Sequence, residues 1–330
     1  MTFRQRAAII GTGSYLPERV LSNADFEKFL DTSDEWITTR TGIKERRIAA
    51  DDESTVDLAA HAARAAIENA GIQPSDLDLI ICASFTPEMP LPSTACLVQQ
   101  RLGAAGCGAF DLAAACSGFV YGLSIAAQFI QTGVYRTVLV IGAETMSRFT
   151  DYQDRGSSIL FGDGAGAVVL QATDQADRGI RYTKMAADGD GWELLFIPAG
   201  GSKRPASRET VEKREHYIQL RGREIYKFAV QKMQFLIQDA LENCGLTADQ
   251  IAMIVPHQVN QRIIDSACEH VGFPSDKVYV NIDRTGNTSA ASIPIALDEA
   301  MRNGKIRRGD TILMVAFGAG LTWASALITI

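Results

Sequence analysis

The sequence predicts an α/β protein built from two similar halves, each an apolar sheet covered by helices. Two stretches with matching residues, Ala66–Ile81 and Ala240–Val255, lie 174 residues apart (240 − 66). Each reads as a helix end, a glycine and a buried strand. A second pair, Phe161–Leu170 and Phe317–Leu327, keeps the same order at an offset of 156 residues (317 − 161). Helices that alternate with nearly continuous apolar strands are typical of sheets covered on both faces.

The change of offset between the two pairs locates a difference between the halves. The first copy carries about 18 extra residues (174 − 156) between its two landmarks, and we expect the proline-rich turn Pro87–Ser93 to lie in that extra length. The predicted units are residues 1–174 and residues 175–330.

Composition bounds the class of protein. The chain has 330 residues, 46% of them hydrophobic, which is enough for a large core. The formal net charge of −7 argues against general nucleic-acid binding. No signal peptide is visible, and no apolar run approaches the ~20 residues that span a bilayer. Six scattered cysteines without metal-ligand spacing favour a reduced, cytoplasmic protein.

Caps, glycines and apolar runs predict the elements of the first half. We expect one helix to begin at Ser22 and the next at Ser33 or Asp34. Side chains of these types accept hydrogen bonds from the free N–H groups of a first helical turn. Apolar residues at helical spacing, stopped by Gly71, predict a helix over 56–69. A further helix is expected near 94–102, after the proline-rich turn. Short apolar runs predict strands at 7–10, 77–83, 109–115 and 137–141.

The second half opens with a long polar stretch, Asp188–Arg221, which we interpret as a surface loop with one short strand. A long helix over 222–242 follows, with Arg223 and Lys227 on its exposed side. Apolar runs then predict strands at 251–255, 278–282 and 311–317.

Cys116 stands where a strand gives way to a helix. The residues before it are apolar except Asp111, and from Ser117 onward apolar residues recur at helical spacing. The positive end of the helix dipole favours an anion there, so we expect the thiol to lose its proton more easily. A nucleophilic thiolate is one interpretation, and a small buried hydrophobic residue is the other.

The second half supplies two candidate partners for this thiol. His257 follows an apolar strand at its carboxyl end, where active sites of α/β sheets gather. Asn287 follows a glycine turn and precedes a helix of small residues, a position that also suits a helix cap. The turn Gly318–Gly320 ends the last strand but one, and its backbone N–H groups are candidates for an oxyanion hole.

Six motifs together resemble one family, over essentially the whole chain. The sequence resembles β-ketoacyl-[acyl-carrier-protein] synthase III, the initiating condensing enzyme of bacterial fatty-acid synthesis, in the thiolase superfamily. The motifs are DTSDEWITTRTG (31–42), AACSGF (114–119), FGDGAG (161–166), VPHQVN (255–260), GNTSAAS (286–292) and AFGAG (316–320). The resemblance implies a thiolase-like fold, with two duplicated α/β halves in a five-layer αβαβα arrangement.

The resemblance also implies a catalytic mechanism. Cys116, His257 and Asn287 match the family's triad, so Cys116 takes the acyl group of a primer acyl-CoA as a thioester. Malonyl-ACP then enters, and His257 and Asn287 stabilise the enolate as CO2 leaves. The backbone N–H groups of Cys116 and Ala319 form the other oxyanion hole. Coenzyme A is part of the substrate, and no cofactor or metal is implied.

Further residues match the family's binding positions. Trp36 and Arg155 match the pair that encloses the CoA adenine, and Arg40 lies at the same mouth. Lys227, Arg262 and, more loosely, Arg223 match basic positions that dock the acidic carrier protein. Leu91 matches the residue that crosses a homodimer interface to close the partner's acyl pocket. Several relatives have Phe there, so Leu91 leaves room for a longer or branched primer.

Other classes of protein fit these residues less well. A degradative thiolase uses a second cysteine near the C-terminal glycine turn, and this chain has no cysteine after Cys268. Elongating condensing enzymes use two histidines. A non-enzymatic scaffold is expected to lose a triad residue. The alternative left open is a related acyl-CoA-dependent condensing enzyme of secondary metabolism with a different primer.

Overall fold

The computed structural model describes residues 5–330, whose two main sheets differ in size; two further sheets consist of two short strands each. The larger sheet has the strand order β1-β7-β6-β4-β5. Strand β4 runs parallel to β5 and β6, whereas β7 is antiparallel to both β6 and β1. The bounds of these strands are β1 Arg6–Tyr15, β4 Leu79–Ala83, β5 Gly108–Leu112, β6 Thr137–Glu144 and β7 Gly164–Thr173.

The smaller sheet repeats this pattern with one strand fewer, in the order β11-β12-β13-β8. Strands β11 and β12 are parallel, and β13 is antiparallel to both β12 and β8. In place of β5 the smaller sheet has only a single parallel bridge, from Val278 to Ile254 of β11. Strand β5 forms a free edge of the larger sheet. The bounds are β8 Gly179–Ala187, β11 Met253–Pro256, β12 Thr311–Gly318 and β13 Thr322–Thr329.

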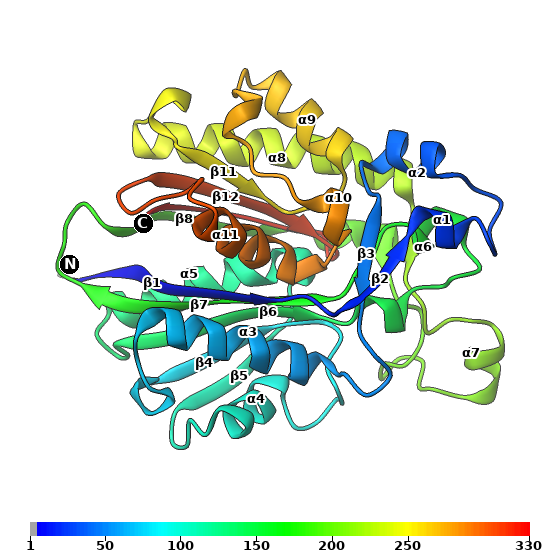
Figure 1. The fold of residues 1–330 in the computed structure, drawn as a ribbon, viewed down its shortest axis with the longest axis horizontal. Coiled ribbons are helices and arrows are strands. Elements are labelled where there is room, and N and C mark those ends of the chain that lie inside the picture. Colours follow the sequence, from blue (N-terminus) through cyan, green and yellow to red (C-terminus); the bar gives the residue numbers. More distant parts are fainter. Residues whose placement is uncertain (1–4) are drawn as a thin grey trace.

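Helices fill three layers around the two sheets, which makes five layers in all (Figure 1). The apolar helices α5 (Gly118–Gln131) and α11 (Ser292–Arg302) lie between the sheets and contribute to one core with residues of both. Helices α3 (Thr55–Ala70) and α4 (Thr94–Leu102) cover the outer face of the larger sheet. Helices α8 (Gly222–Cys244) and α9 (Gln261–His270) cover the smaller one. The predicted five-layer arrangement is confirmed.

The repeat at an offset of 174 residues is visible in atomic detail. Helices α3 and α8 both end at a glycine in the left-handed conformation, Gly71 (φ 67°) and Gly245 (φ 62°). A 3₁₀ turn follows in each copy, and then β4 or β11 begins. A glycine in the left-handed conformation lets the last carbonyls of a helix accept hydrogen bonds at no steric cost. The same glycine therefore ends the helix in both copies of the repeat.

The second landmark of the repeat is different in the structure. Strands β6 and β12 also start 174 residues apart (311 − 137), so the extra residues come after β6 and not at the proline-rich turn. They lie within the 19 residues 145–163, where the other half needs only the three residues 319–321 to join β12 to β13, an excess of 16 (19 − 3). Phe161 therefore precedes β7, whereas Phe317 lies within β12, and the two phenylalanines are not equivalent.

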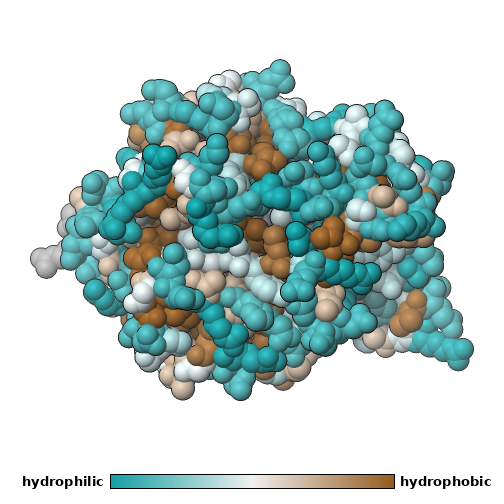
Figure 2. All heavy atoms as spheres, in the orientation of Figure 1, coloured by the Kyte–Doolittle hydropathy of each residue, from teal (hydrophilic) through white to brown (hydrophobic). Residues whose placement is uncertain are grey.

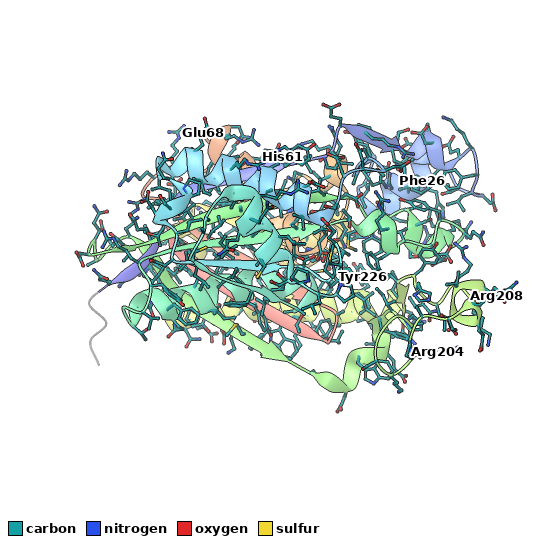
Figure 3. All side chains as sticks on the ribbon, turned by 90° about the horizontal axis from the view of Figure 1, so that it is seen from below. Phe26, His61, Glu68, Arg204, Arg208 and Tyr226 are labelled. Atoms are coloured by element: carbon teal, nitrogen blue, oxygen red, sulfur yellow. The ribbon has the colours of Figure 1, made fainter. Side chains whose placement is uncertain are left out.

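Smaller elements form the end of the molecule that carries α1, α2, α6 and α7 (Figure 1). Ser22 and Ser33 cap α1 and α2 as expected. The polar stretch 188–221 holds two short paired strands and a helix, with Arg204 and Arg208 exposed at its tip (Figure 3). The bounds are β2 Arg19–Ser22, β3 Glu45–Ile48, α1 Asn23–Phe26, α2 Asp34–Thr41, α6 Arg155–Ser158, α7 Arg208–Glu212, β9 Leu195–Phe196 and β10 Gln219–Leu220.

Two expected strands differ from the structure. Residues 278–282 form no strand: Val278 makes a single bridge to Ile254, and the short helix α10 (Ile282–Thr285) follows. Strand β5 stops at Leu112, and its residues are only half-buried because it lies at the sheet edge. An apolar run shows burial, but it does not show whether neighbouring backbone is free to pair.

The surface seen in Figure 2 is mostly hydrophilic, and apolar side chains show as separate patches. Within residues 5–330, no helix combines the length and apolar character needed to cross a membrane. The same residues contain no cluster of three His, Cys, Asp or Glu side chains arranged to hold a metal ion.

Candidate active site

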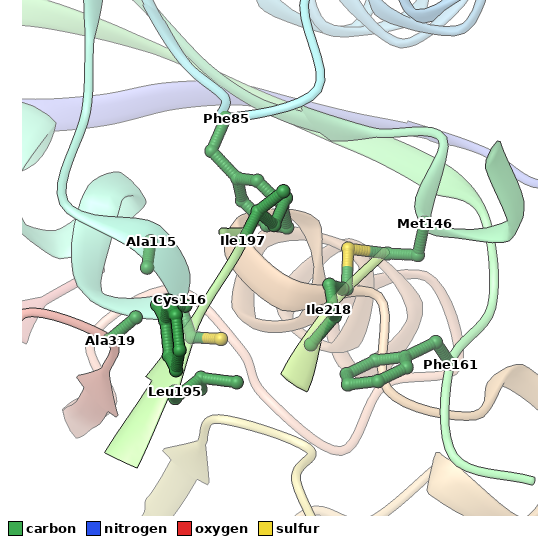
Figure 4. Close-up of a pocket in the computed structure, with 10 residues that line it drawn as sticks. Phe85, Ala115, Cys116, Met146, Phe161, Leu195, Ile197, Ile218 and Ala319 are labelled. Carbon is green, nitrogen blue, oxygen red and sulfur yellow. The ribbon is translucent and has the colours of Figure 1, made fainter. Parts of the chain in front are cut away.

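Cys116 lies on a 3₁₀ turn, Ala115–Ser117, that leads directly into α5. Its side chain is 8% exposed and points into an apolar cavity (Figure 4). Burial raises the pKa of the Cys116 thiol to about 12. The expectation that the helix dipole makes this thiol more acidic is therefore wrong, because loss of hydration outweighs the favourable field. The thiol needs a base to become a nucleophile.

His257 is held at the carboxyl end of β11 by backbone and side-chain contacts. Its N–H donates to the Val315 carbonyl of β12 at 2.8 Å, and its Nδ1 lies 2.8 Å from Ser292 Oγ. Ser292 Oγ also accepts the N–H of Gln258, so its own proton is available to Nδ1. In the tautomer in which Ser292 donates to Nδ1, the imidazole proton is on Nε2. Burial lowers the pKa of His257 to about 3, so the ring is neutral.

Asn287 belongs to the second half but is fixed to the first. Its N–H donates to the Leu160 carbonyl at 2.9 Å, and its carbonyl accepts from Gly162 N–H at 3.1 Å. Its Oδ1 accepts the N–H of Ser289 at 2.9 Å. Asn287 is not a helix cap, because the cap positions of the helical turns that follow it lie further along the chain. Its bond to Ser289 is a local turn contact that uses Oδ1 and leaves the Nδ2 donors for a ligand.

One cavity of about 360 Å³ brings Cys116, His257 and Asn287 together. Its wall comes from both halves of the chain, and the backbone contacts of Asn287 join the halves at this point. At the outer end, aromatic and basic side chains line the cavity: Trp36, Arg40, Tyr226 and Arg262.

A second cavity of about 220 Å³ continues beyond Cys116 and is almost entirely apolar. Both cavities share Cys116, Phe161 and Leu195 in their walls. The thiol is therefore placed between a long mouth with a basic rim and an apolar chamber. The remaining wall of the chamber is formed by Phe85, Ala115, Met146, Phe196, Ile197, Ile218 and Ala319.

Gly318 allows the turn after β12 to approach Cys116. A side chain at this position would place its Cβ 2.7 Å from the Cys116 nitrogen, so only glycine fits. Ala319 comes next and lines the apolar chamber. Within residues 5–330, the N–H groups of Cys116 and Ala319 have no protein acceptor among the turn and loop hydrogen bonds.

The predicted adenine site is closed in this structure. The guanidinium of Arg155 lies 5.0 Å from the centre of the Trp36 ring, and that of Arg40 lies at 4.6 Å. Arg155 Nη1 also donates to the Asp31 carbonyl at 2.9 Å. Two stacked contacts at about 3.5 Å each need about 7 Å between Trp36 and Arg155, so an adenine would have to displace the arginine.

The other predicted binding residues lie outside the two cavities, except Arg262. Lys227 and Arg223 are exposed on α8. Tyr226 of the same helix, labelled in Figure 3, lines the mouth. The Arg262 guanidinium lies 5.9 Å from the Tyr226 ring centre. Leu91 is 84% exposed and touches neither cavity.

Comparisons with known proteins agree with this geometry. The family described as 3-oxoacyl-[acyl-carrier-protein (ACP)] synthase III matches residues 110–189, and the C-terminal part of the same family matches residues 241–330. A β-ketoacyl-[acyl-carrier-protein] synthase III of Caldanaerobacter subterraneus subsp. tengcongensis is 57% identical over 322 residues, which are 98% of this chain and 97% of that protein. The chain belongs to the 3-oxoacyl-ACP synthase III family.

Solved structures show the same relationship. The synthase III of Aquifex aeolicus superposes with a TM-score of 0.91 at 49% identity, covering 98% of this chain and 100% of the other. The priming β-ketosynthase of the R1128 polyketide pathway has a TM-score of 0.91 at 38% identity, with 100% and 98% covered. As a synthase III family member the chain is a condensing acyltransferase, and its predicted thiolase-like fold is confirmed.

Sequence reasoning missed three residues that shape this synthase III site. Ser292 orients His257, and Ser289 contacts both Cys116 and Asn287. Glu144 is fully buried and accepts a hydrogen bond from Ser289. The two serines stand within the motif 286–292, so their position was a signal. A carboxylate that ends an otherwise apolar strand was the signal for Glu144.

Proposed function

We propose that this chain condenses a primer acyl-CoA with malonyl-ACP to give β-ketoacyl-ACP, CO2 and CoA, the initiating step of fatty-acid synthesis. One observation carries the proposal: Cys116 lies between a long basic mouth and an apolar chamber, with His257 and Asn287 in the same cavity. This order matches the order of groups in the substrate: the phosphates of the carrier face the basic mouth, the thioester meets Cys116, and the acyl chain enters the apolar chamber.

In the first half-reaction Cys116 takes the acyl group. Trp36, Arg155 and Arg40 hold the nucleotide end of the acyl-CoA at the mouth, after Arg155 moves aside. The acyl chain enters the apolar chamber, and the thiolate attacks the thioester carbonyl. The N–H groups of Cys116 and Ala319 stabilise the oxyanion, and CoA leaves.

In the second half-reaction malonyl-ACP replaces CoA. His257 Nε2–H and Asn287 Nδ2–H donate to the malonyl thioester oxygen while CO2 leaves, and this stabilises the enolate. A neutral imidazole suits the role, because it donates one hydrogen bond without giving up its proton to the enolate. The enolate carbon attacks the acyl-Cys116 carbonyl, and the Cys116 thiolate departs. Decarboxylation supplies the carbanion, so the reaction requires no cofactor.

Carrier docking is proposed for the basic residues beside the mouth, Lys227, Arg262 and Arg223. We expect Lys227→Glu to raise the KM for malonyl-ACP about 10-fold and to leave the KM for acyl-CoA nearly unchanged, because rim charges steer an acidic partner. Steady-state kinetics with each substrate varied in turn check this. Lys305→Glu is the charge-matched control. Lys305 is exposed and precedes Thr311, the first residue of β12, so it lies at the end of that strand opposite Gly318. Equal effects on both substrates would remove Lys227 from the docking surface.

The assembly and setting are also part of the proposal. The free edge of β5 and the exposed Leu91 suit a homodimer in which Leu91 reaches the partner's acyl chamber. Residues 1–174 supply the nucleophile, and residues 175–330 supply His257 and Asn287. The six free cysteines suit the reducing cytoplasm.

The alternative is a related condensing enzyme of secondary metabolism with a different primer, which the polyketide priming neighbour favours. Intact-protein mass spectrometry after incubation with acyl-CoAs from acetyl to decanoyl tests both functions. Rapid single acylation by short primers is expected for initiation of fatty-acid synthesis. Acylation by long primers alone would favour the alternative.

A further inference from the structure

A chain of three buried groups starts at the nucleophile. The Cys116 thiol donates to Ser289 Oγ at 3.4 Å, and Ser289 Oγ donates to Glu144 Oε1 at 3.1 Å. Ser289 and Glu144 are fully buried, and Cys116 is nearly so. The three residues come from different elements, the turn before α5, the turn before α11 and the end of β6, so only the tertiary fold brings them together.

The two oxygens of Glu144 have very different surroundings. Oε2 accepts from four donors, namely Ser84 Oγ at 3.2 Å, Thr86 Oγ1 at 2.6 Å, Thr86 N–H at 3.2 Å and Phe85 N–H at 3.3 Å. Among the described residues, Oε1 accepts only from Ser289. The saturated oxygen fixes the carboxylate in place, and the other oxygen keeps a lone pair directed at Ser289 and room for a proton.

Ser289 is also fixed, which keeps the chain connected. Its backbone has a positive φ of 50°, uncommon for a residue other than glycine, and its N–H donates to Asn287 Oδ1 at 2.9 Å. A residue held in such a conformation at an active site points to a functional constraint on its side chain.

We propose that Glu144 accepts the Cys116 proton through Ser289 when Cys116 attacks the acyl-CoA. The Cys116 proton moves to Ser289 Oγ as the Ser289 proton moves to Glu144 Oε1, which leaves a thiolate, a neutral serine and a carboxylic acid. The sulfur then forms a bond to the acyl carbon, and the carbon–sulfur bond to CoA breaks. CoA leaves as a thiolate and is protonated by water. This proposal rests on the proposed function of Cys116.

The same path runs in reverse during condensation. The enolate carbon bonds to the acyl carbon, the carbon–sulfur bond to Cys116 breaks, and the Cys116 thiolate takes a proton back through Ser289 from Glu144. Glu144 ends as a carboxylate, so the enzyme returns to its starting protonation state. No oxidant, reductant or further reactant is required.

The pKa values favour Glu144 over His257 as the acceptor of the Cys116 proton. Burial raises the pKa of Glu144 to about 7, so a proton taken from a thiol is held there near neutral pH. Burial lowers the pKa of His257 to about 3, and its Nδ1 is already engaged with Ser292. The titratable groups that sense the Glu144 charge are the thiols of Cys116 and Cys82. The groups that bond the carboxylate are the hydroxyls and backbone N–H groups named above.

The test is the pH dependence of single-turnover acylation by acetyl-CoA, followed by rapid quenching and intact mass. In the unchanged protein the rate is expected to fall as pH drops through about 7, because protonated Glu144 cannot accept another proton. Glu144→Gln and Ser289→Ala are each expected to slow acylation at pH 8 by about 10²-fold. Both variants should also lose the break near pH 7, so that the rate rises steadily with pH.

Matched controls separate this role from a structural one. Asp163→Asn removes another fully buried carboxylate, and burial raises the pKa of Asp163 as well. The Asp163 carboxylate accepts from the N–H groups of Ala49 and Ser147 and does not contact Cys116 or Ser289. It should keep the break near pH 7. Malonyl-ACP decarboxylation should persist in Glu144→Gln and Ser289→Ala, because His257 and the backbone anchor of Asn287 are untouched.

Three outcomes would decide against the relay. They are a break that survives in Glu144→Gln, a break that survives in Ser289→Ala, and a profile of the unchanged protein without any break between pH 5 and 9. If Glu144→Gln does not fold, Ser289→Ala and the unchanged protein still give the answer. Failure of the unchanged protein to acylate at any pH would instead contradict the proposed function.

Discussion

Cys116→Ser is expected to lower acyl transfer from acyl-CoA by at least about 10³-fold. A serine hydroxyl is much harder to deprotonate than a thiol, and burial has already raised the pKa of the Cys116 thiol to about 12. Cys116 lines both cavities, so under the proposed function it is the sulfur that meets the CoA thioester. Intact mass after incubation with acetyl-CoA measures the covalent product directly.

The matched control for this prediction is Cys96→Ser. Cys96 is exposed on α4 and lines neither cavity, so its loss should leave acylation unchanged. Stoichiometric acylation of Cys116→Ser, or loss of acylation in Cys96→Ser, would show that another residue is the nucleophile.

His257→Ala and Asn287→Asp are expected to separate the two half-reactions. Each should lower malonyl-ACP decarboxylation by about 10²-fold or more, because each removes a donor to the developing enolate. Asn287→Asp keeps an oxygen that accepts the Ser289 N–H, so the turn stays anchored while the Nδ2 donors are lost. Acylation by acetyl-CoA should persist, since its oxyanion hole is made of backbone N–H groups. Release of labelled CO2 and intact mass give the two readouts.

An exposed histidine on α9 provides the control. His270→Ala should match the unchanged protein in both half-reactions. Normal CO2 release by both His257→Ala and Asn287→Asp would remove these residues from the decarboxylation step.

Local signals in the sequence were sufficient for much of the fold. Ser22 and Ser33 are helix caps in the structure, and Gly71 and Gly245 end helices in the left-handed conformation. Such features depend on a few neighbouring residues, so they are visible in a single sequence. The repeat added the arrangement of the sheets, because copies of one unit repeat their strand order.

Tertiary effects decide features that a local pattern does not show. Arg46 stands in a basic run of the sequence and is nevertheless fully buried, with its guanidinium bonded to Asn23 and Ile159 and placed over the Phe26 ring. Residues 278–282 have a strand pattern, but only Val278 pairs. In both cases distant residues decide the outcome, and a local pattern cannot report them.

In the site, too, some features could be predicted from the sequence and others depend on the tertiary structure. The matching motifs predicted Cys116, His257 and Asn287, and the cavity that joins them confirms that the three lie together. The acidity of the thiol was predicted wrongly, because the local helix dipole is visible in sequence and the degree of burial is not. The contact of Cys116 with Glu144 through Ser289 crosses the fold and has no local signature.

The most direct test of the central claim uses the purified protein, acetyl-CoA and malonyl-ACP in a single reaction. Mass spectrometry of the carrier protein should show acetoacetyl-ACP, together with one CO2 and one free CoA for each product formed. Carrier protein that remains malonylated, or that loses CO2 without gaining the acetyl group while Cys116 is acylated, would contradict a condensation at this site.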